Sequence, residues 1–297
     1  MDERAALALL AERLPAAGDD AAVVDDLVVT TDMLHERTDF PDGTTRYTAG
    51  WRAVGASLSD VAAMGAAARG AVAAYGAPAF DPDDLLAFVD GASDVCAAVD
   101  AEYVGGDLDG HTEFTVATTA FGRTDDPVRR SGASPGEVVC VTGALGRTAA
   151  ALRRFEADET ERGNDLFRFT PRVAAGRALA GHATAMMDVS DGLARSLHQL
   201  AEASGVGFAA AWDDLPVVAA VDAVARDEAD RRELAAFVGE DFELLFTLPA
   251  DRVAAARRAC SVPLSVVGEV REAAAGVTAD GEALPDRGFT HAADSAE

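Results

Sequence analysis

The chain contains no lysine, and this absence excludes several classes of protein. A Walker-A phosphate loop, a Schiff-base enzyme and a kinase with a β-strand lysine all depend on a lysine side chain. If the protein handles phosphate groups, arginine side chains, backbone N–H groups and metal ions must provide the positive charge. Cysteine is also rare, since Cys96, Cys140 and Cys260 stand far apart without CxxC spacing. This pattern favours neither a disulfide framework nor a zinc site, and it indicates the reducing cytoplasm.

Long apolar runs are absent as well. No stretch approaches the ~18 to 20 consecutive apolar residues that a membrane helix needs, so we expect no membrane span. Residues 1–14, MDERAALALLAERL, lack a basic n-region and a cleavage site, and they predict an amphipathic helix in place of a signal peptide. The hydrophobic content of 49% is ample for a packed core, and 297 residues suit one large or two medium domains.

Acidic residues dominate the charge, with 33 Asp and 18 Glu against 25 Arg and a net charge of −26. Such a charge argues against binding to nucleic acid or to an anionic membrane. We interpret it as a halophilic adaptation to high intracellular salt, where charges are screened within ~3 Å at 1 M. Because aspartate is so frequent, a lone aspartate carries no functional information, and only aspartates in a defined context count.

Strand-like and helix-like patterns alternate along the chain and predict two α/β halves with mixed or parallel pairing. The predicted strands cover residues 27–34, 70–76, 102–107, 113–122, 138–143, 184–190, 205–212, 242–249 and 264–270. Helices are predicted over residues 46–66, 82–99, from about 147, and over 171–181, 192–205 and 253–260. Residues 156–165 are predicted to form an exposed acidic loop. The turn-rich segment 123–137 is the best linker candidate, which predicts domains of residues 1–130 and 131–297.

Carboxylates recur where predicted strands end and helices begin. In MMDVSDGL (186–193), Asp188 closes an apolar strand, whereas Ser190 or Asp191 could simply cap the following helix. Asp60 lies in a helix of small residues, where a buried carboxylate is costly without a partner. Ordinary turns or caps could equally explain each of four other segments: GDDAAVV (18–24), TTDM (30–33), GGD (105–107) and GEDFELLF (239–246).

Taken together, these oxygen-bearing side chains suit magnesium, a hard ion that usually shares its shell with phosphate and water. The candidate set from both halves comprises Asp32, Asp60, Asp107, Asp188 and Asp191. A multi-aspartate magnesium site on a lysine-free chain points to phosphate chemistry.

A set of motifs in a fixed order covers nearly the whole chain, from residue 18 to 291. The motifs are GDDAAV, TTDML, SLSDVAAMGA, GGD, RSGASPGE, VTGALGRTAAAL, TPR, MDVSDGL, GEDFELLFT and RGFTH. This ordered set resembles the thiamine-monophosphate kinase family, of the same superfamily as aminoimidazole ribonucleotide synthetase. The resemblance implies an α/β (α+β) fold with an N-terminal sheet domain that pairs with a second subunit into a β-barrel, giving a homodimer. It also implies a C-terminal α/β domain, with ATP and substrate bound in the cleft between the domains.

The activity implied by the resemblance is transfer of the ATP γ-phosphoryl group to thiamine monophosphate, giving thiamine diphosphate, with Mg²⁺ as cofactor. The family's magnesium ligands map onto Asp20, Thr30, Thr31, Asp32, Asp60, Asp107, Asp188 and Asp191. Its ATP contacts map onto Gly106, Asp107, Arg130 and Ser190, and its substrate contacts onto Glu240, Phe289 and, where a histidine is usual, Asp39. No dedicated catalytic base is needed, because the second pKa of a phosphate monoester lies near ~6 and the attacking oxygen is already ionised. We therefore expect direct in-line transfer without a phosphoenzyme.

Several positions depart from the family pattern. Asp39 replaces a histidine and puts an anion near the acceptor phosphate, whereas Arg52 replaces a lysine and can preserve an anion contact. The other departures are Ser57 for Asn, Val238 for Gly, and Leu108-Asp109 after GGD. They leave two alternatives open: another ATP-binding member of the superfamily, or a non-catalytic homologue that binds ATP or metal.

Overall fold

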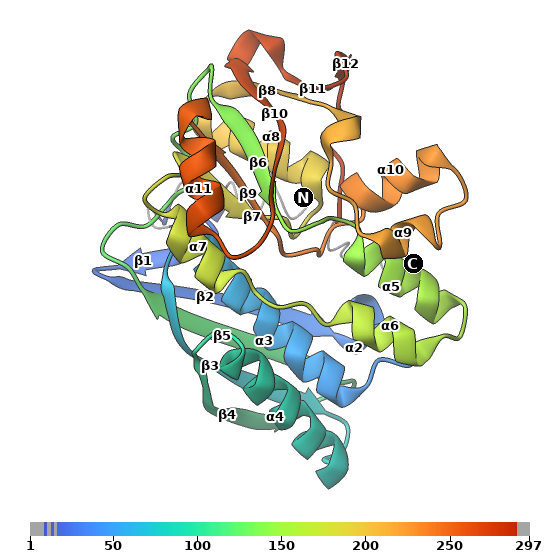
Figure 1. Cartoon of the computed structure of the whole chain (residues 1–297). Helices are drawn as coiled ribbons and strands as arrows, with labels where there is room; N and C mark the ends of the chain where they lie inside the picture. Colours follow the sequence, from blue (N-terminus) through green and yellow to red (C-terminus); the bar gives the residue numbers. More distant parts are fainter. Residues whose placement is uncertain (1–8, 11–12, 15–16, 290–297) are drawn as a thin grey trace.

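The computed structural model describes residues 9–10, 13–14 and 17–289, and it contains two mixed β-sheets with helices packed on them (Figure 1). The helix predicted over residues 1–14 falls mostly outside the described residues, as does the end of the RGFTH segment. No helix in the described part of the chain is long and apolar enough to cross a membrane.

The N-terminal sheet has five strands in the order β1-β2-β5-β3-β4. Their bounds are β1 (Ala22–Val24), β2 (Leu27–His35), β5 (Thr115–Arg123), β3 (Ala67–Ala77) and β4 (Glu102–Gly110). Neighbouring strands are antiparallel except for the parallel pair β3–β4. The helices of this half are α2 (Glu36–Asp39), α3 (Arg46–Ala63) and α4 (Pro82–Ala97), of which α3 and α4 pack against each other and the sheet.

Glycine determines how closely α3 and α4 approach. A Cβ on Gly50 would lie 2.1 Å from the carbonyl oxygen of Phe88, and one on Gly91 would lie 2.0 Å from that of Tyr47. The two backbones can touch only because both positions lack a side chain. The small residues of α3 thus place it at the centre of the molecule, where it also contacts the second sheet (Figure 1).

The second sheet has seven strands in the order β12-β11-β8-β10-β6-β9-β7. Their bounds are β12 (Glu282–Ala283), β11 (Val277–Ala279), β8 (Val206–Ala210), β10 (Leu264–Glu272), β6 (Val138–Thr142), β9 (Leu244–Leu248) and β7 (Ala185–Asp188). The helices are α5 (Arg147–Glu156), α6 (Thr160–Phe167), α7 (Val173–Leu179), α8 (Leu193–Ser204), α9 (Ala219–Asp222), α10 (Glu228–Ala236) and α11 (Val253–Ala259). Short 3₁₀ turns cover Trp212–Asp214, Ala250–Arg252 and Ala273–Ala275. Among the described strands of this sheet, β11 and β8 are the one parallel pair, so the mixed pairing allowed for by the sequence is present in both sheets.

Within the described residues, the sequence patterns located each predicted strand and helix from residue 27 onward to within a few residues, but the loop prediction for residues 156–165 is wrong. Helix α6 begins at Thr160. Its Asn164 is buried, accepts a hydrogen bond from the backbone N–H of Thr45 at 2.9 Å and donates one to the carbonyl of Gly43 at 2.9 Å. The buried side-chain amide of Asn164 thus holds α6 in place, at a position where a helix would usually bury an apolar side chain.

Candidate active site

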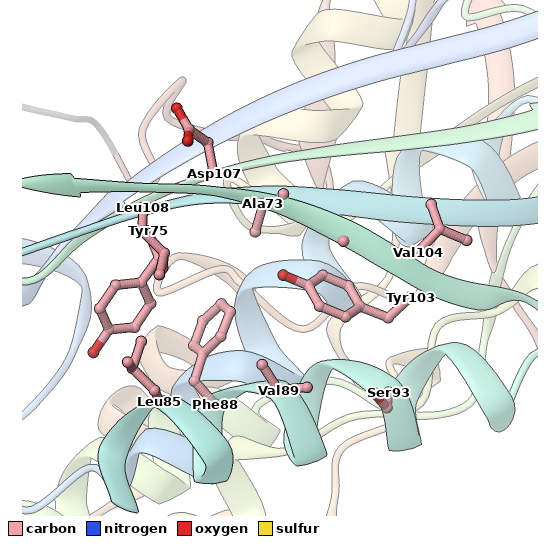
Figure 2. Close-up of a pocket in the computed structure, with 12 residues that line it drawn as sticks. Ala73, Tyr75, Leu85, Phe88, Val89, Ser93, Tyr103, Val104, Asp107 and Leu108 are labelled. Atoms are coloured by element: carbon pink, nitrogen blue, oxygen red, sulfur yellow. The ribbon is translucent and has the colours of Figure 1, made fainter. Parts of the chain in front are cut away.

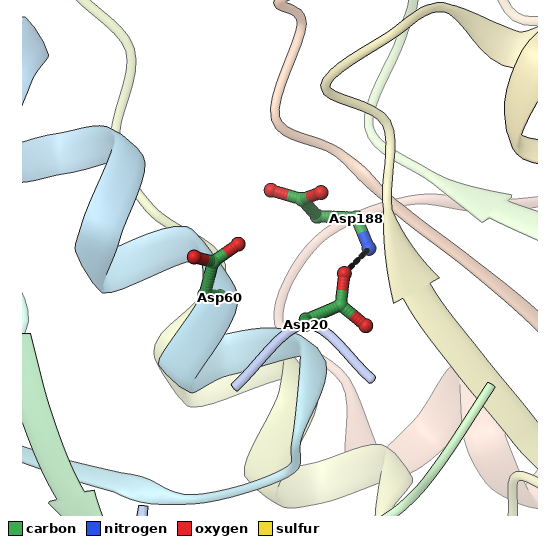
Figure 3. Close-up of side chains that lie close together, drawn as sticks. All are labelled: Asp20, Asp60 and Asp188. Carbon is green, nitrogen blue, oxygen red and sulfur yellow. Dashed lines mark hydrogen bonds between the residues drawn. The ribbon is translucent and has the colours of Figure 1, made fainter. Parts of the chain in front are cut away.

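Three carboxylates from distant parts of the chain converge where the two halves meet (Figure 3). Asp20 comes from the loop before β1, Asp60 from α3 and Asp188 from the end of β7. One oxygen atom of each lies within 4.8 Å of the other two. The backbone N–H of Asp188 also donates a hydrogen bond to Asp20 Oδ1 at 3.4 Å.

The surroundings of Asp60 and Asp188 disfavour the ionised acids. Asp188 is 1% exposed; its Oδ2 accepts a hydrogen bond from Ser59 at 2.7 Å, while its Oδ1 is buried without a hydrogen-bond partner. Burial, and next the charge of Asp20, raise the pKa of Asp188 to about 7. The pKa of Asp60 lies well above its usual value because of burial and the charges of Asp32, Asp188 and Asp20, although Thr30 donates a hydrogen bond to its carboxylate at 2.6 Å.

Arg130 provides positive charge to the trio. Its Nη2 and Nε donate to the two oxygens of Asp20 at 3.0 and 3.2 Å. One guanidinium cannot balance Asp20, Asp60 and Asp188, and buried carboxylates without enough positive charge are costly. The buried, unpartnered Oδ1 of Asp188 and the all-oxygen donor set therefore fit a hard divalent cation such as Mg²⁺.

The residues of TTDM lie within β2, so the alternative that they cap a helix is wrong. Asp32 accepts a hydrogen bond from Ser57 of α3 and faces that helix, together with Thr30. Thr31 is exposed, and its hydroxyl donates to the carbonyl of Thr118 at 2.9 Å. Alternation along the strand thus puts Thr30 and Asp32 beside the trio and turns Thr31 to the other face.

Asp107 lies apart from the trio. It belongs to the edge strand β4, where it pairs with Ala74 of β3. Ala74 pairs in turn with Ala117 of β5, and Ala117 pairs with Met33 of β2, so these four residues form one row across the sheet. Three strand spacings separate the two ends of this row by about 14 Å. Figure 2 shows the Asp107 side chain on the opposite face of the sheet from Tyr103 and the helix α4. The described part of a single chain therefore does not gather the five candidate aspartates into one group.

A cavity of about 420 Å³ opens between α4 and β4 (Figure 2). Tyr75, Phe88 and Tyr103 supply aromatic surface, and the predicted nucleotide residues Gly106 and Asp107 line its rim. A Cβ on Gly106 would lie 1.8 Å from the carbonyl oxygen of Ala73, so only glycine fits there. The cavity has the size and apolar lining typical of a small-molecule site.

Three loops of the second half are tied together by backbone hydrogen bonds beside the trio. The carbonyls of the DVSDG loop (188–192) accept from the N–H groups of Glu240 at 2.5 Å, Phe242 at 3.0 Å and Phe289 at 2.9 Å. The side chain of Asp191 accepts from Gln199 at 3.1 Å and lies outside the trio. The alternative that Ser190 or Asp191 caps α8 is wrong, because the cap is Gly192, at φ 100°, without a side-chain hydrogen bond.

Arg52 is buried and joins the two halves. Its Nη2 lies 2.9 Å from Glu240 Oε2, its Nη1 donates to the carbonyl of Phe167 at 2.8 Å, and its guanidinium stacks 3.6 Å above the Phe167 ring. The rings of Phe169 and Phe242 stack nearby at 4.2 Å. The sequence suggested an anion contact for Arg52, but only the fold reveals that the anion is the chain's own Glu240.

Glu240 and Phe242 both adopt positive φ, 56° and 53°, which is uncommon for residues other than glycine. Such conformations persist only where the surroundings hold them, and they cluster at functional sites.

The side chain of Asp39 makes hydrogen bonds to its own neighbours in the chain: its Oδ2 accepts from the N–H of His35 at 2.7 Å and from the Thr38 hydroxyl at 2.8 Å. Its role toward a substrate stays a prediction.

Comparison with known proteins decides the family. Residues 18–124 match "AIR synthase related protein, N-terminal domain", and residues 134–280 match the C-terminal domain of the same family. A thiamine-monophosphate kinase of Halobacterium salinarum is 65% identical over 291 residues, which cover 98% of this chain and 100% of the relative. The chain belongs to the thiamine-monophosphate kinase family.

Other members of the thiamine-monophosphate kinase family agree with this assignment. The enzyme of Methanospirillum hungatei is 40% identical over 282 residues, 92% of each chain. The crystal structure from Stenotrophomonas maltophilia K279a has a TM-score of 0.81 at 34% identity and covers 90% of each chain. The structure of AaThiL complexed with AMPPCP and TMP has a TM-score of 0.89 at 27% identity and covers 98% of this chain and 97% of that one. The predicted family and the two-domain α/β fold are confirmed.

Proposed function

We propose that this chain transfers the γ-phosphoryl group of ATP to thiamine monophosphate and so makes thiamine diphosphate. Its relatives carry the name thiamine-monophosphate kinase, and AaThiL was solved with AMPPCP and TMP. The observation that carries the proposal is the trio of buried Asp20 and Asp188 and half-buried Asp60 on a lysine-free chain. A phosphate-transfer site needs positive charge, and in this chain the acidic residues would supply it by binding a metal ion.

Asp20, Asp60 and Asp188 would hold Mg²⁺. Bound Mg²⁺ supplies positive charge at the phosphate oxygens. Thr30 and Ser59 orient two of these carboxylates by hydrogen bonds, and Arg130 lies beside Asp20 where it can also contact a phosphate. The remaining proposed ligands are Thr30, Thr31, Asp32, Asp107 and Asp191, and the remaining proposed ATP contacts are Gly106 and Ser190.

The cavity between α4 and β4 suits the base of ATP, because the aromatic rings of Tyr75, Phe88 and Tyr103 offer stacking surface. On the acceptor side, thiamine monophosphate carries a cationic ring and an aminopyrimidine. The carboxylate of Glu240, oriented by Arg52, and the ring of Phe289 complement these groups. The acceptor phosphate is already ionised, so the contribution of the chain is to hold the donor and acceptor in line.

We further propose a homodimer formed through the N-terminal sheet. The face away from α3 and α4 carries Met33 and Val104, which are 55% and 56% exposed, and Val29 and Phe121, which are partly exposed. The trio lies beside the β1 edge of the sheet, whereas Asp107 lies on the β4 edge. Closing two sheets into a barrel sets β4 of one copy beside β1 of the other and brings Asp107 to the partner's trio.

Mixing two inactive variants tests the dimer. If Asp107 acts on the partner's site, Asp107→Ala and Asp188→Ala chains mixed under subunit exchange form one intact site per mixed dimer. Activity should then return, up to about half that of the wild type in each mixed dimer. No recovery, with exchange verified by mass, would show that both residues serve the same chain's site.

The direct test of the function uses purified protein in high salt with ATP, Mg²⁺ and thiamine monophosphate, and it measures thiamine diphosphate. No product above a control without enzyme would overturn the kinase proposal. ATP binding without product would instead support the non-catalytic homologue. Rapid ADP–ATP exchange in the absence of acceptor, or a trapped phosphoprotein, would contradict direct transfer.

Two further assignments accompany this proposal. We place the domain boundary near residue 130, in the segment between β5 and β6 that lacks regular structure. We also place the protein in the cytoplasm, since Cys96, Cys140 and Cys260 are free and buried, as a reducing compartment allows.

A further inference from the structure

The end of the described chain, residues 284–289, forms a strap that crosses α8 and α10 without regular structure. Its first part is fastened to α8. The ring Nε2 of His198 lies 2.9 Å from the carbonyl oxygen of Leu284, and Arg195 forms an ion pair with Asp286 at 2.8 Å. Leu284 is buried, so this end of the strap is anchored by both polar and apolar contacts.

The middle of the strap is fastened to α10 by Arg287. Two nitrogens of its guanidinium donate to the two oxygens of Glu233, each at 2.5 Å. The same guanidinium lies 3.9 Å from the centre of the Phe237 ring. A fork-to-fork pair fixes orientation as well as distance, and the ring below it adds a cation–π contact. Because both charged groups are partly exposed, we expect this anchor to be modest in strength.

The close approach of the strap's last residues to the DVSDG loop depends on Gly288. A Cβ at this position would lie 2.0 Å from the carbonyl oxygen of Asp191 and 2.9 Å from Cβ of Arg195. The close approach allows the N–H of the next residue, Phe289, to donate to that same carbonyl at 2.9 Å. Phe289 is thereby held on the DVSDG loop, whose Ser190 carbonyl accepts the N–H of Glu240.

We propose that Arg287 and Gly288 are positioning residues for the acceptor, because they seat Phe289 against the DVSDG loop beside Glu240. This inference rests on the proposed function, in which Phe289 contacts thiamine monophosphate. A free chain end would have to be ordered each time the acceptor binds, and that entropy cost would weaken acceptor binding. A strap docked beforehand removes this cost. The cavity between α4 and β4 and the carboxylates of Asp20 and Asp60 are built by other elements, whereas Asp188 belongs to the loop on which the strap docks. We therefore expect the seating of the strap to act mainly on the acceptor.

The test compares Gly288→Ala with the matched control Gly181→Ala, whose added Cβ meets nothing within 4 Å. Gly288→Ala must shift the strap by more than an ångström, so the KM for thiamine monophosphate should rise on the order of 10- to 100-fold. The KM for ATP should stay within about twofold, and Gly181→Ala should change neither constant. Arg287→Ala should raise the acceptor KM by a few-fold, and Arg287→Lys should recover part of that loss.

Hydrogen exchange at the Phe289 amide reports docking without any turnover. This amide should be protected in the wild type and in Gly181→Ala, and it should exchange rapidly in Gly288→Ala. An unchanged acceptor KM in a Gly288→Ala protein whose strap has come free overturns the proposal, and so does unchanged protection. If the wild type makes no thiamine diphosphate, the proposed function fails instead. In that case the affinity for thiamine monophosphate, measured by calorimetry, tests the role of the strap. Gly288→Ala must weaken this affinity, and Gly181→Ala must leave it unchanged.

Discussion

Replacing Asp188 by asparagine should abolish activity and yet stabilise the metal-free protein. Asparagine keeps the shape of the side chain and can keep the hydrogen bond from Ser59, but it removes the charge beside Asp20. The pKa of Asp188 is raised from 3.8 to about 7 in the fold. The stability contributed by a carboxyl with a raised pKa is fully present below 3.8 and is lost as the pH rises through 7.

The size of the gain follows from this shift. About three pH units correspond to a penalty on the order of 4 kcal/mol for ionised Asp188 at pH 8, which the asparagine variant escapes. The stability difference between variant and wild type should therefore grow from pH 5 to pH 8. Magnesium should reverse the order, because binding to the folded wild type stabilises it and the variant has lost a ligand.

The assay is urea unfolding in chelator and in Mg²⁺ at each pH, together with turnover of thiamine monophosphate. Asp230→Asn is a control of opposite sign. Hydrogen bonds from Arg226 hold the pKa of Asp230 below its usual value, and this residue lies outside the site. Its variant should be less stable at pH 8 and still active. A loss of stability in chelated Asp188→Asn at pH 8 would refute the electrostatic reasoning, and near-normal turnover would refute the metal assignment.

Three further predictions follow from contacts described above. Arg52→Met leaves the half-buried Glu240, whose side chain is 15% exposed, without its cation. Urea unfolding should then show a loss in the free energy of unfolding of about 3 kcal/mol, of which Arg52→Lys recovers a part, and equal stability of all three proteins would contradict the role of the pair. Gly106→Ala drives a Cβ into the carbonyl of Ala73 and should raise the KM for ATP at least tenfold with little change for the acceptor, which steady-state kinetics can check. Raising KCl from about 0.1 M to about 2 M should raise the melting temperature by screening the net charge of −26, and a flat salt profile would remove the halophilic interpretation.

Helices and strands with a clear periodic pattern of residue types were predictable from the sequence, because such a pattern depends only on neighbouring residues. Small residues at helical spacing identified α3, and β-branched residues identified β2. The pattern at α8 was equally clear, since Gly205 ends the helix at φ 66°, as a left-handed cap does. Helix α6 was missed because its buried contact is made by Asn164, a polar residue that signals a loop when read alone.

The site was predictable only in part, because membership of a metal site depends on which face each residue occupies. The sequence identified Asp60 and Asp188 as carboxylates that burial would make costly, and the structure brings them together. Asp20 came from the family resemblance alone, since its own segment reads as a turn. That Asp107 lies on another edge and face of the sheet than Asp60 depends on strand order, which no local pattern encodes.

Under the proposed function, helix α3 would also set the distance between the metal site and the acceptor site. Its Asp60 belongs to the carboxylate trio, and its Arg52 pairs with Glu240, the proposed acceptor contact. The eight residues from Arg52 to Asp60 separate the two positions by roughly 12 Å along the helix axis and by a rotation of roughly 80° about it. In this proposal the separation of donor and acceptor would be set by the rise of the helix and not by the length of a loop. One residue inserted between positions 52 and 60 would rotate Asp60 by roughly 100° about the helix axis relative to Arg52.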